Sequence, residues 1–113
     1  MASDQSFVEY VCEQAKLSDA LSYKKMFGEY ALYLDSKVVA LVADNQLFVK
    51  PTNEGKTLLD VVTEHPPYFG AKPHLLIGDE IDNGELLKNL LTVTARALPL
   101  PKPKPAKRKK KLD

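Results

Sequence analysis

The chain has 113 residues, of which 44% are hydrophobic and 27% are charged, and its only cysteine is Cys12. This size and composition are typical of one soluble domain with a single core, and a lone cysteine excludes an internal disulfide framework. Since the sequence has neither a signal-peptide pattern nor an apolar stretch of about 18 residues, we expect a cytoplasmic protein that does not span a membrane.

The formal net charge of +1 is divided unevenly along the chain. Residues 1–98 contain 9 basic and 14 acidic residues, a net charge of −5, whereas residues 99–113 contain 7 basic residues and one acid, a net charge of +6. Parts of opposite charge interact differently with polyanions. We therefore predict a domain over residues 1–98, followed by a disordered, Pro/Lys-rich basic tail over residues 99–113.

The first predicted element is a helix from about Asp4 to Lys16. Its apolar residues recur at helical spacing, and Ser6 with Glu9 has the form of a capping box. A turn then leads into an extended segment that begins near Ser22.

Alternation of side chains predicts that this extended segment continues as one long strand. Met26 then lies on the same face of the strand as Tyr30. Phe27 lies on the opposite face, with Tyr33. Gly28 falls inside this strand, and we interpret it as the position that lets the sheet curve over a helix.

Two more strand-like runs follow, Val38–Ala43 and Gln46–Lys50, and Pro51 ends the second of them. Asp44 and Asn45 between the runs are typical of a hairpin tip. Connections this short do not allow parallel crossovers, so we expect the strands to form an antiparallel meander.

A second helix is predicted after Pro51. Thr52 or Asn53 can cap its start. Val62 belongs to its apolar stripe, and the two prolines after His65 end it.

Two short strands, Tyr68–Gly70 and His74–Ile77, and a third helix complete the predicted domain. Asp82 with Glu85 forms a capping box before a broad apolar helical face that Pro99 ends. The fold class is therefore α+β, with two layers, an antiparallel sheet of about five strands with helices, and the order α-β-β-β-α-β-β-α.

The start of the strand region also carries a recognisable Met-Phe-Gly-x-Tyr pattern. With it, the chain resembles the N-terminal domain of the TfoX/Sxy family over roughly residues 4–98, and it is most similar to short single-domain members with a Pro/Lys-rich end. The resemblance implies a two-layer α+β fold, a link to regulators of natural competence for DNA uptake, and no enzymatic activity. The motif residues, which we interpret as structural, are Met26, Phe27, Gly28, Tyr30, Tyr33 and Lys50.

No catalytic, cofactor-binding or metal-binding residue is predicted. Cys12 lies in the apolar stripe of the first helix, where cysteine behaves as a small hydrophobic residue. His65 and His74 are nine residues apart and lack the spacing of a zinc site. The acidic residues between 79 and 85 fall at a helix start, where the helix dipole favours carboxylates.

The basic tail is the strongest functional candidate in the sequence. Its side chains can neutralise phosphates without reading base sequence, which gives weak, non-specific and salt-dependent binding. A purely solubilising role is the alternative. The candidate polyanion-binding residues are Lys102, Lys104, Lys107, Arg108, Lys109, Lys110 and Lys111.

These observations predict a non-enzymatic regulatory or protein-interaction module with an unknown protein partner. A homodimer is a further expectation, because the edge of an open sheet must be covered, paired or charged. The first alternative is a weak nucleic-acid binder that acts through the tail. The second is a small enzyme with an unrecognised site between the first helix and the sheet.

Overall fold

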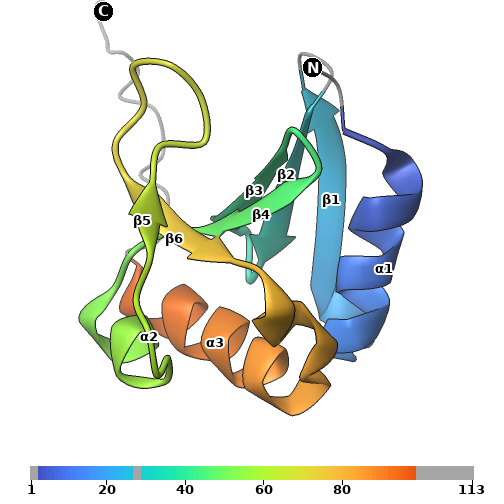
Figure 1. Cartoon of the computed structure of the whole chain (residues 1–113). Helices are drawn as coiled ribbons and strands as arrows, with labels where there is room; N and C mark the ends of the chain where they lie inside the picture. The colour runs from blue at the N-terminus through green and yellow to red at the C-terminus, as the bar shows by residue number, and fades with distance from the viewer. Residues whose placement is uncertain (1–2, 27–28, 99–113) are drawn as a thin grey trace, which may run out of the picture.

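A computed structural model of the chain describes residues 3–26 and 29–98, which form an α+β fold of two layers (Figure 1). The described strands form one antiparallel sheet in the order β1-β2-β3-β4-β6-β5. The predicted fold class is confirmed, with six strands in place of about five. The elements are α1 (Gln5–Ala15), η1 (Ser18–Ala20), β1 (Leu21–Met26), β2 (Glu29–Leu34), β3 (Lys37–Ala43), β4 (Gln46–Val49), α2 (Asn53–Thr57), β5 (Glu64–His65), β6 (His74–Ile77), η2 (Asp79–Asp82) and α3 (Gly84–Ala97).

The additional strand arises because the long first strand of the prediction is a hairpin. β1 and β2 pair antiparallel, and Met26 is the partner of Glu29. Met26 therefore lies on the face of Glu29, and its predicted place beside Tyr30 is wrong. Alternation on both sides of a two-residue connection resembles one continuous strand, which is why the sequence pattern missed the reversal. Phe27 and Gly28 lie outside the described residues.

Two-residue turns connect β2 to β3 and β3 to β4. Asp35 and Ser36 have φ angles of 55° and 63°, and Asp44 and Asn45 have φ angles of 52° and 54°. Positive φ at both central residues is the geometry of the hairpin turn whose twist matches that of paired strands. The predicted meander and its hairpin tip at Asp44 and Asn45 are confirmed.

The core lies between one face of the sheet and the helices α1 and α3, which meet at the lower right of Figure 1. Each strand contributes alternate residues to this side, as the pleat requires. The fully buried side chains in this cluster include Val8 and Val11 of α1, Leu87, Leu90 and Leu91 of α3, and Leu32, Val42, Leu47 and Leu75 of the sheet.

The caps of α1 and α3 differ from the predicted capping boxes. Asp4 precedes α1 without a side-chain cap, because its carboxylate and backbone N–H both interact with Asn45 of the β3–β4 turn. Ser6 therefore lies inside the helix. Asn83, and not Asp82, caps α3 by accepting a hydrogen bond from the Leu86 backbone N–H at 3.2 Å.

The second helix is shorter than predicted. Thr52 caps α2 by accepting from the Gly55 backbone N–H at 2.9 Å, as expected. However, α2 ends at Thr57, and Val62 is 41% exposed instead of buried in a helical stripe. Val62 and Thr63 are β-branched and favour extended backbone, and the Thr63 carbonyl accepts a hydrogen bond from Leu76 of β6 at 2.8 Å.

The short strand that pairs with β6 is also displaced from its predicted position. β5 is Glu64–His65, whereas Tyr68–Gly70 forms the tip of a loop and belongs to no strand. β6 occupies His74–Ile77 as predicted. Because the prolines at 66 and 67 have no backbone N–H, the chain can pair with β6 only before them.

Leu90→Ala tests the core between α3 and the sheet. Leu90 is fully buried, so we expect truncation to lower the free energy of unfolding by about 2–5 kcal/mol. Chemical denaturation followed by circular dichroism measures the change. The control is Asn89→Ala on the exposed side of α3, expected within about 0.5 kcal/mol of wild type. Equal stability of both variants would contradict the assigned core.

Gly84→Ala tests the contact between the start of α3 and the end of α1. A Cβ atom at Gly84 would lie 2.6 Å from the Gln14 carbonyl oxygen, which is backbone and cannot rotate away. We expect destabilisation of about 1–3 kcal/mol even though alanine is the better helix former. A variant as stable as wild type in the same denaturation experiment would show that the two helices do not approach this closely.

Candidate functional site

None of the described helices packs against the second face of the sheet, and we call it the helix-free face. Its position follows from the strand register, since the residues between the core positions must point away from α1 and α3. The row that crosses the sheet on this face consists of Lys24, Ala31, Leu41, Phe48 and Leu76.

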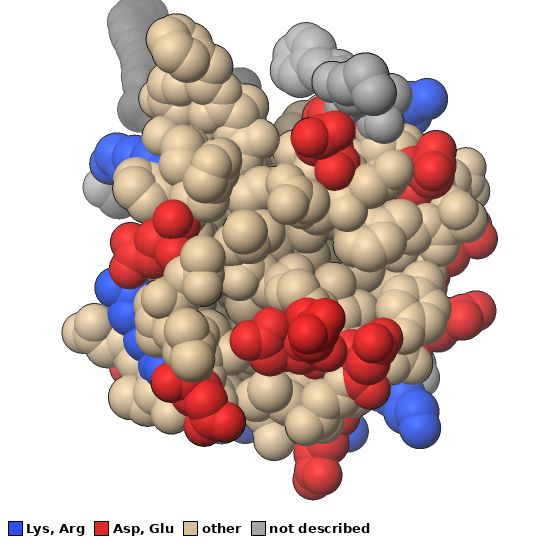
Figure 2. Space-filling model, viewed as in Figure 1, with Lys and Arg blue, Asp and Glu red and all other residues tan. Residues whose placement is uncertain are grey.

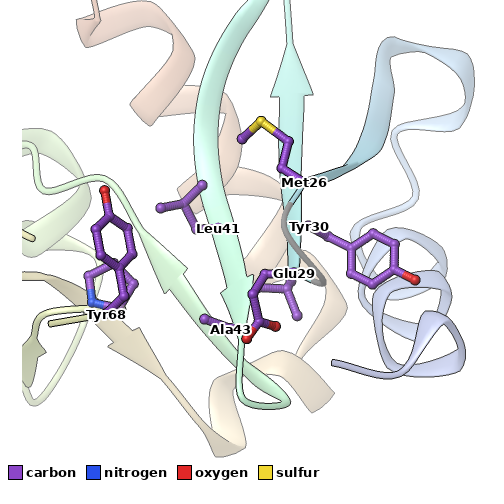
Figure 3. A pocket seen from close by; sticks show the side chains of 8 residues that line it. Met26, Glu29, Tyr30, Leu41, Ala43 and Tyr68 are labelled. Atoms are coloured by element: carbon purple, nitrogen blue, oxygen red, sulfur yellow. The ribbon is translucent and has the colours of Figure 1, made fainter. Parts of the chain in front are cut away.

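The loop of residues 66–73 lies beside this face and closes one side of an apolar hollow of about 550 Å³ (Figure 3). Pro67 is buried, and Tyr68 is 63% exposed. In Figure 3, Leu41 extends towards Tyr68, whereas the Tyr30 side chain points the other way, towards the core. The residues that line the apolar hollow are Met26, Glu29, Tyr30, Leu41, Val42, Ala43, Pro67 and Tyr68.

Glu29 is the only charged residue among the described side chains that line the hollow. Its carboxylate accepts a hydrogen bond from the Ser3 hydroxyl at 2.6 Å and from the Asp44 backbone N–H at 3.3 Å. Both donors are neutral, and no ion pair with Glu29 occurs within residues 3–26 and 29–98. The hollow therefore combines an apolar surface with one carboxylate, and no described histidine, cysteine or basic residue lines it.

His65 and His74 are brought together by the β5–β6 hairpin, where they are direct cross-strand partners. Both lie on the helix-free face, and the His65 ring is 6.3 Å from the ring of Phe48. The Nδ1 atoms lie 2.8 Å and 2.9 Å from the carbonyl oxygens of Pro66 and Lys72, respectively. The sequence prediction considered only helical spacing and missed this pair. A hairpin prediction, with His65 and His74 on the two sides of the Pro-rich loop, would have placed the two histidines opposite each other.

Metal-ligating groups do not gather elsewhere in the described part of the chain. No group of three or more His, Cys, Asp or Glu residues there is arranged to hold an ion. The acidic residues near the start of α3 make protein contacts instead. Glu80 accepts from the Gly78 backbone N–H at 3.0 Å, and Asp82 accepts from the hydroxyl of Tyr10 in α1. Figure 2 shows acidic side chains gathered over η2 and the start of α3.

Cys12 is half-buried in α1 and packs against the core, on the opposite side of the sheet from His65 and His74. Burial, and to a smaller extent the negative charge of Glu9, raises the pKa of its thiol to about 11. A nucleophilic cysteine requires a lowered pKa. The charged group that shifts this pKa is Glu9, whose negative charge disfavours the thiolate.

The family can be named once this architecture is known. Residues 13–97 match the family described as TfoX N-terminal domain. The chain belongs to this family. It is also 41% identical over 98 residues, or 87% of its length, to a Spirochaeta aurantia protein whose name is "Uncharacterized 12.7 kDa protein in trpE 5'region", of which the match covers 85%. No solved structure matches the chain significantly.

The described motif residues of this TfoX N-terminal domain lie in different parts of the fold. Tyr30 is buried in the core, where its ring meets Tyr23 edge-on at 5.7 Å. Tyr33 lies on the helix-free face, with the Lys24 ammonium 5.7 Å from its ring centre. The Lys50 backbone N–H donates to the Val39 carbonyl at 2.9 Å.

Two described motif residues line the apolar hollow, Tyr30 and Met26, and of these Met26 is exposed, at 43%. It was predicted as structural, and only the hairpin between β1 and β2 places it beside Glu29 at this surface. The polyanion-binding candidates between 102 and 111 lie outside the described residues of the TfoX N-terminal domain.

None of the described helices has both the length and the apolar character that crossing a bilayer requires.

The rate of alkylation tests whether the pKa of the Cys12 thiol is raised in the folded protein. With its pKa near 11, we expect iodoacetamide to modify the folded protein at pH 8 about 100-fold more slowly than the protein unfolded in guanidinium. The rate should rise about tenfold per pH unit above pH 8, because only the thiolate reacts.

The same pKa shift has a consequence for stability. A thiol pKa that is higher in the folded state contributes stability below the unfolded pKa of about 8.5, and this contribution is lost as the pH rises towards 11. Cys12→Ser is the control that removes both effects. Equal alkylation rates in the folded and unfolded protein would instead contradict the raised pKa of the Cys12 thiol.

Proposed function

We propose that this TfoX N-terminal domain is a non-enzymatic, cytoplasmic protein-interaction module with a regulatory role, and that its partners bind the helix-free face. The observation that carries the proposal is the apolar hollow with exposed Met26 and Tyr68 at its margin. Contiguous exposed apolar surface with aromatic side chains is a common feature of protein-binding sites.

The chemistry of the hollow supports binding over catalysis. Catalytic sites bring together titratable groups whose environments shift their pKa values. Here the hollow has a single carboxylate, which Ser3 and the Asp44 backbone hold in place. The one thiol of the chain, Cys12, has a raised pKa and lies on the other side of the sheet. A role like that of the competence regulators that contain this domain fits such a module.

Affinity capture from the source cells tests the proposal, with wild-type chain, Met26→Asp and Val61→Ser as baits. Met26→Asp places a charge at the hollow, whereas Val61 is 69% exposed and does not line it, so Val61→Ser is the matched control. We expect a specific set of proteins to be retained by wild type and Val61→Ser and lost from Met26→Asp. Identical sets from all three baits would contradict a role for this face.

The charge of the tail supports a second candidate function, weak nucleic-acid binding. The +6 charge of residues 99–113 opposes the −5 charge of residues 1–98, so any contact with phosphates must depend on the tail. If the tail engages about five phosphates, the affinity for DNA should fall with salt concentration at a log–log slope of roughly −4 to −5.

Fluorescence anisotropy with labelled DNA measures this binding across a salt series. The comparison is between the wild-type chain and a full-length variant in which the seven basic tail residues are replaced by glutamine. We expect the variant to lose all salt-dependent binding. Equal binding by both proteins would contradict a tail-based contact and point to the folded domain.

A further inference from the structure

We propose that the helix-free face binds a second copy of the same chain, with Phe69 of each copy inserted into the apolar hollow of the other. This inference rests on the proposed function, because it uses the same face, and it names one specific partner for it. Four features support it: an exposed aromatic side chain, a hollow of suitable size, their positions on the surface, and their charges.

Phe69 is the most exposed large hydrophobic side chain among the described residues, with a relative exposure of 103%. It stands at the tip of the 66–73 loop, where the Ala71 backbone N–H donates to the Tyr68 carbonyl at 3.1 Å and Gly70 adopts a φ of 88°. This tight turn and the flanking prolines restrict the loop before binding, which reduces the entropy lost on association. Such a residue is suited to anchor an interface.

The apolar hollow is large enough to receive this side chain. Its volume is about 550 Å³, whereas a cavity of about 150 Å³ already accommodates a benzene ring. The apolar groups of Met26, Leu41 and Ala43 would contact the ring on several sides. Phe69 does not fill the hollow of its own chain, since it is fully exposed.

The positions of Phe69 and the hollow favour a closed pair over a polymer. Tyr68 lines the hollow, and Phe69 is the next residue along the chain, so the exposed ring and the hollow are joined through one loop. When a projecting group and its receptor are part of the same patch, a two-fold axis satisfies both contacts at once. The assembly would therefore stop at two copies.

The charges of the two surfaces are complementary. Glu29 contributes a negative charge to the hollow, and no described cation pairs with it. Lys72 is exposed and lies three residues after Phe69 on the same loop. Insertion of Phe69 would bring this ammonium towards Glu29 of the other copy, which favours the correct orientation during association.

The two free sheet edges do not require pairing. β1 carries the exposed residues Lys24 and Lys25, and β5 has only two residues. Charged side chains and short length are the means by which proteins prevent edge-to-edge association. The expected homodimer is therefore assigned to the helix-free face and not to an edge.

The available area predicts a weak dimer. A fully exposed aromatic side chain presents roughly 150–250 Å². Because Phe69, Tyr68 and Met26 are 103%, 63% and 43% exposed, burying them in two copies would remove roughly 600–1,000 Å² from water. Specific stable interfaces bury about 1,200–2,000 Å². We therefore expect a concentration-dependent equilibrium in the micromolar range.

Sedimentation equilibrium of the full-length chain from about 10 to 1,000 µM tests the proposal. Wild type and the exposed control Val61→Ser should both show a monomer–dimer equilibrium. Phe69→Ala should raise the dissociation constant at least tenfold, and Lys72→Glu several-fold. A strictly monomeric wild type, or a Phe69→Ala variant that dimerises like wild type, would overturn the inference.

Disulfide trapping locates the contact. In a Cys12→Ser background, chains with Phe69→Cys are mixed with chains with Met26→Cys under mild oxidation, so that a bond between the two kinds of chain reports insertion into the hollow. We expect these mixed dimers to form at least tenfold faster than in the control mixture of Val61→Cys with Met26→Cys. Equal rates would overturn the proposed arrangement.

The two proposals can fail separately. A monomeric wild type that still loses its captured proteins on Met26→Asp substitution would overturn the dimer and leave the interaction face supported. A trapped dimer whose captured proteins do not respond to Met26→Asp would support the dimer and contradict binding of other proteins at this face.

Discussion

One-sided packing of α1 and α3 on the sheet is the constraint on which the rest of the structure depends. Because side chains alternate along each strand, burying Leu32, Val42 and Leu75 under the helices necessarily directs the intervening residues to the opposite face. That face carries Ala31, Leu41 and other apolar residues but receives no helix. The strand register that forms the core therefore also places apolar side chains on the opposite face of the sheet.

The 66–73 loop covers only part of this surface. Pro67 of the loop is buried, and Phe48 on the helix-free face is only 2% exposed. The tip of the loop nevertheless leaves Tyr68 and Phe69 exposed to solvent. Removing apolar side chains from water is favourable by roughly 25 cal/mol per Å². Burying the hollow and the exposed Phe69 ring therefore provides a driving force for association. The Glu29 carboxylate at the hollow favours partners that place a positive charge beside it.

Local sequence patterns predicted the structure correctly where the conformation of a residue depends on its neighbours in the sequence. Asp44 and Asn45 tolerate positive φ, and Thr52 has a hydroxyl at the right distance to cap the following turn, so both positions were predicted correctly. The reversal between Met26 and Glu29 was missed because the apolar alternation resumes after it. The end of α2 was missed because a distant strand, β6, offers hydrogen bonds to the residues that follow.

By itself, the sequence determined the α+β class, the meander, most helix positions and the family, since these follow from periodicity, turn residues and a short motif. Only the tertiary structure decided that Met26 and Tyr68 line one apolar hollow, that His65 lies opposite His74, and that Phe69 is exposed. The physical reason is that these relations depend on strand register and on the course of one loop. Register is a property of paired strands, so no single segment contains it.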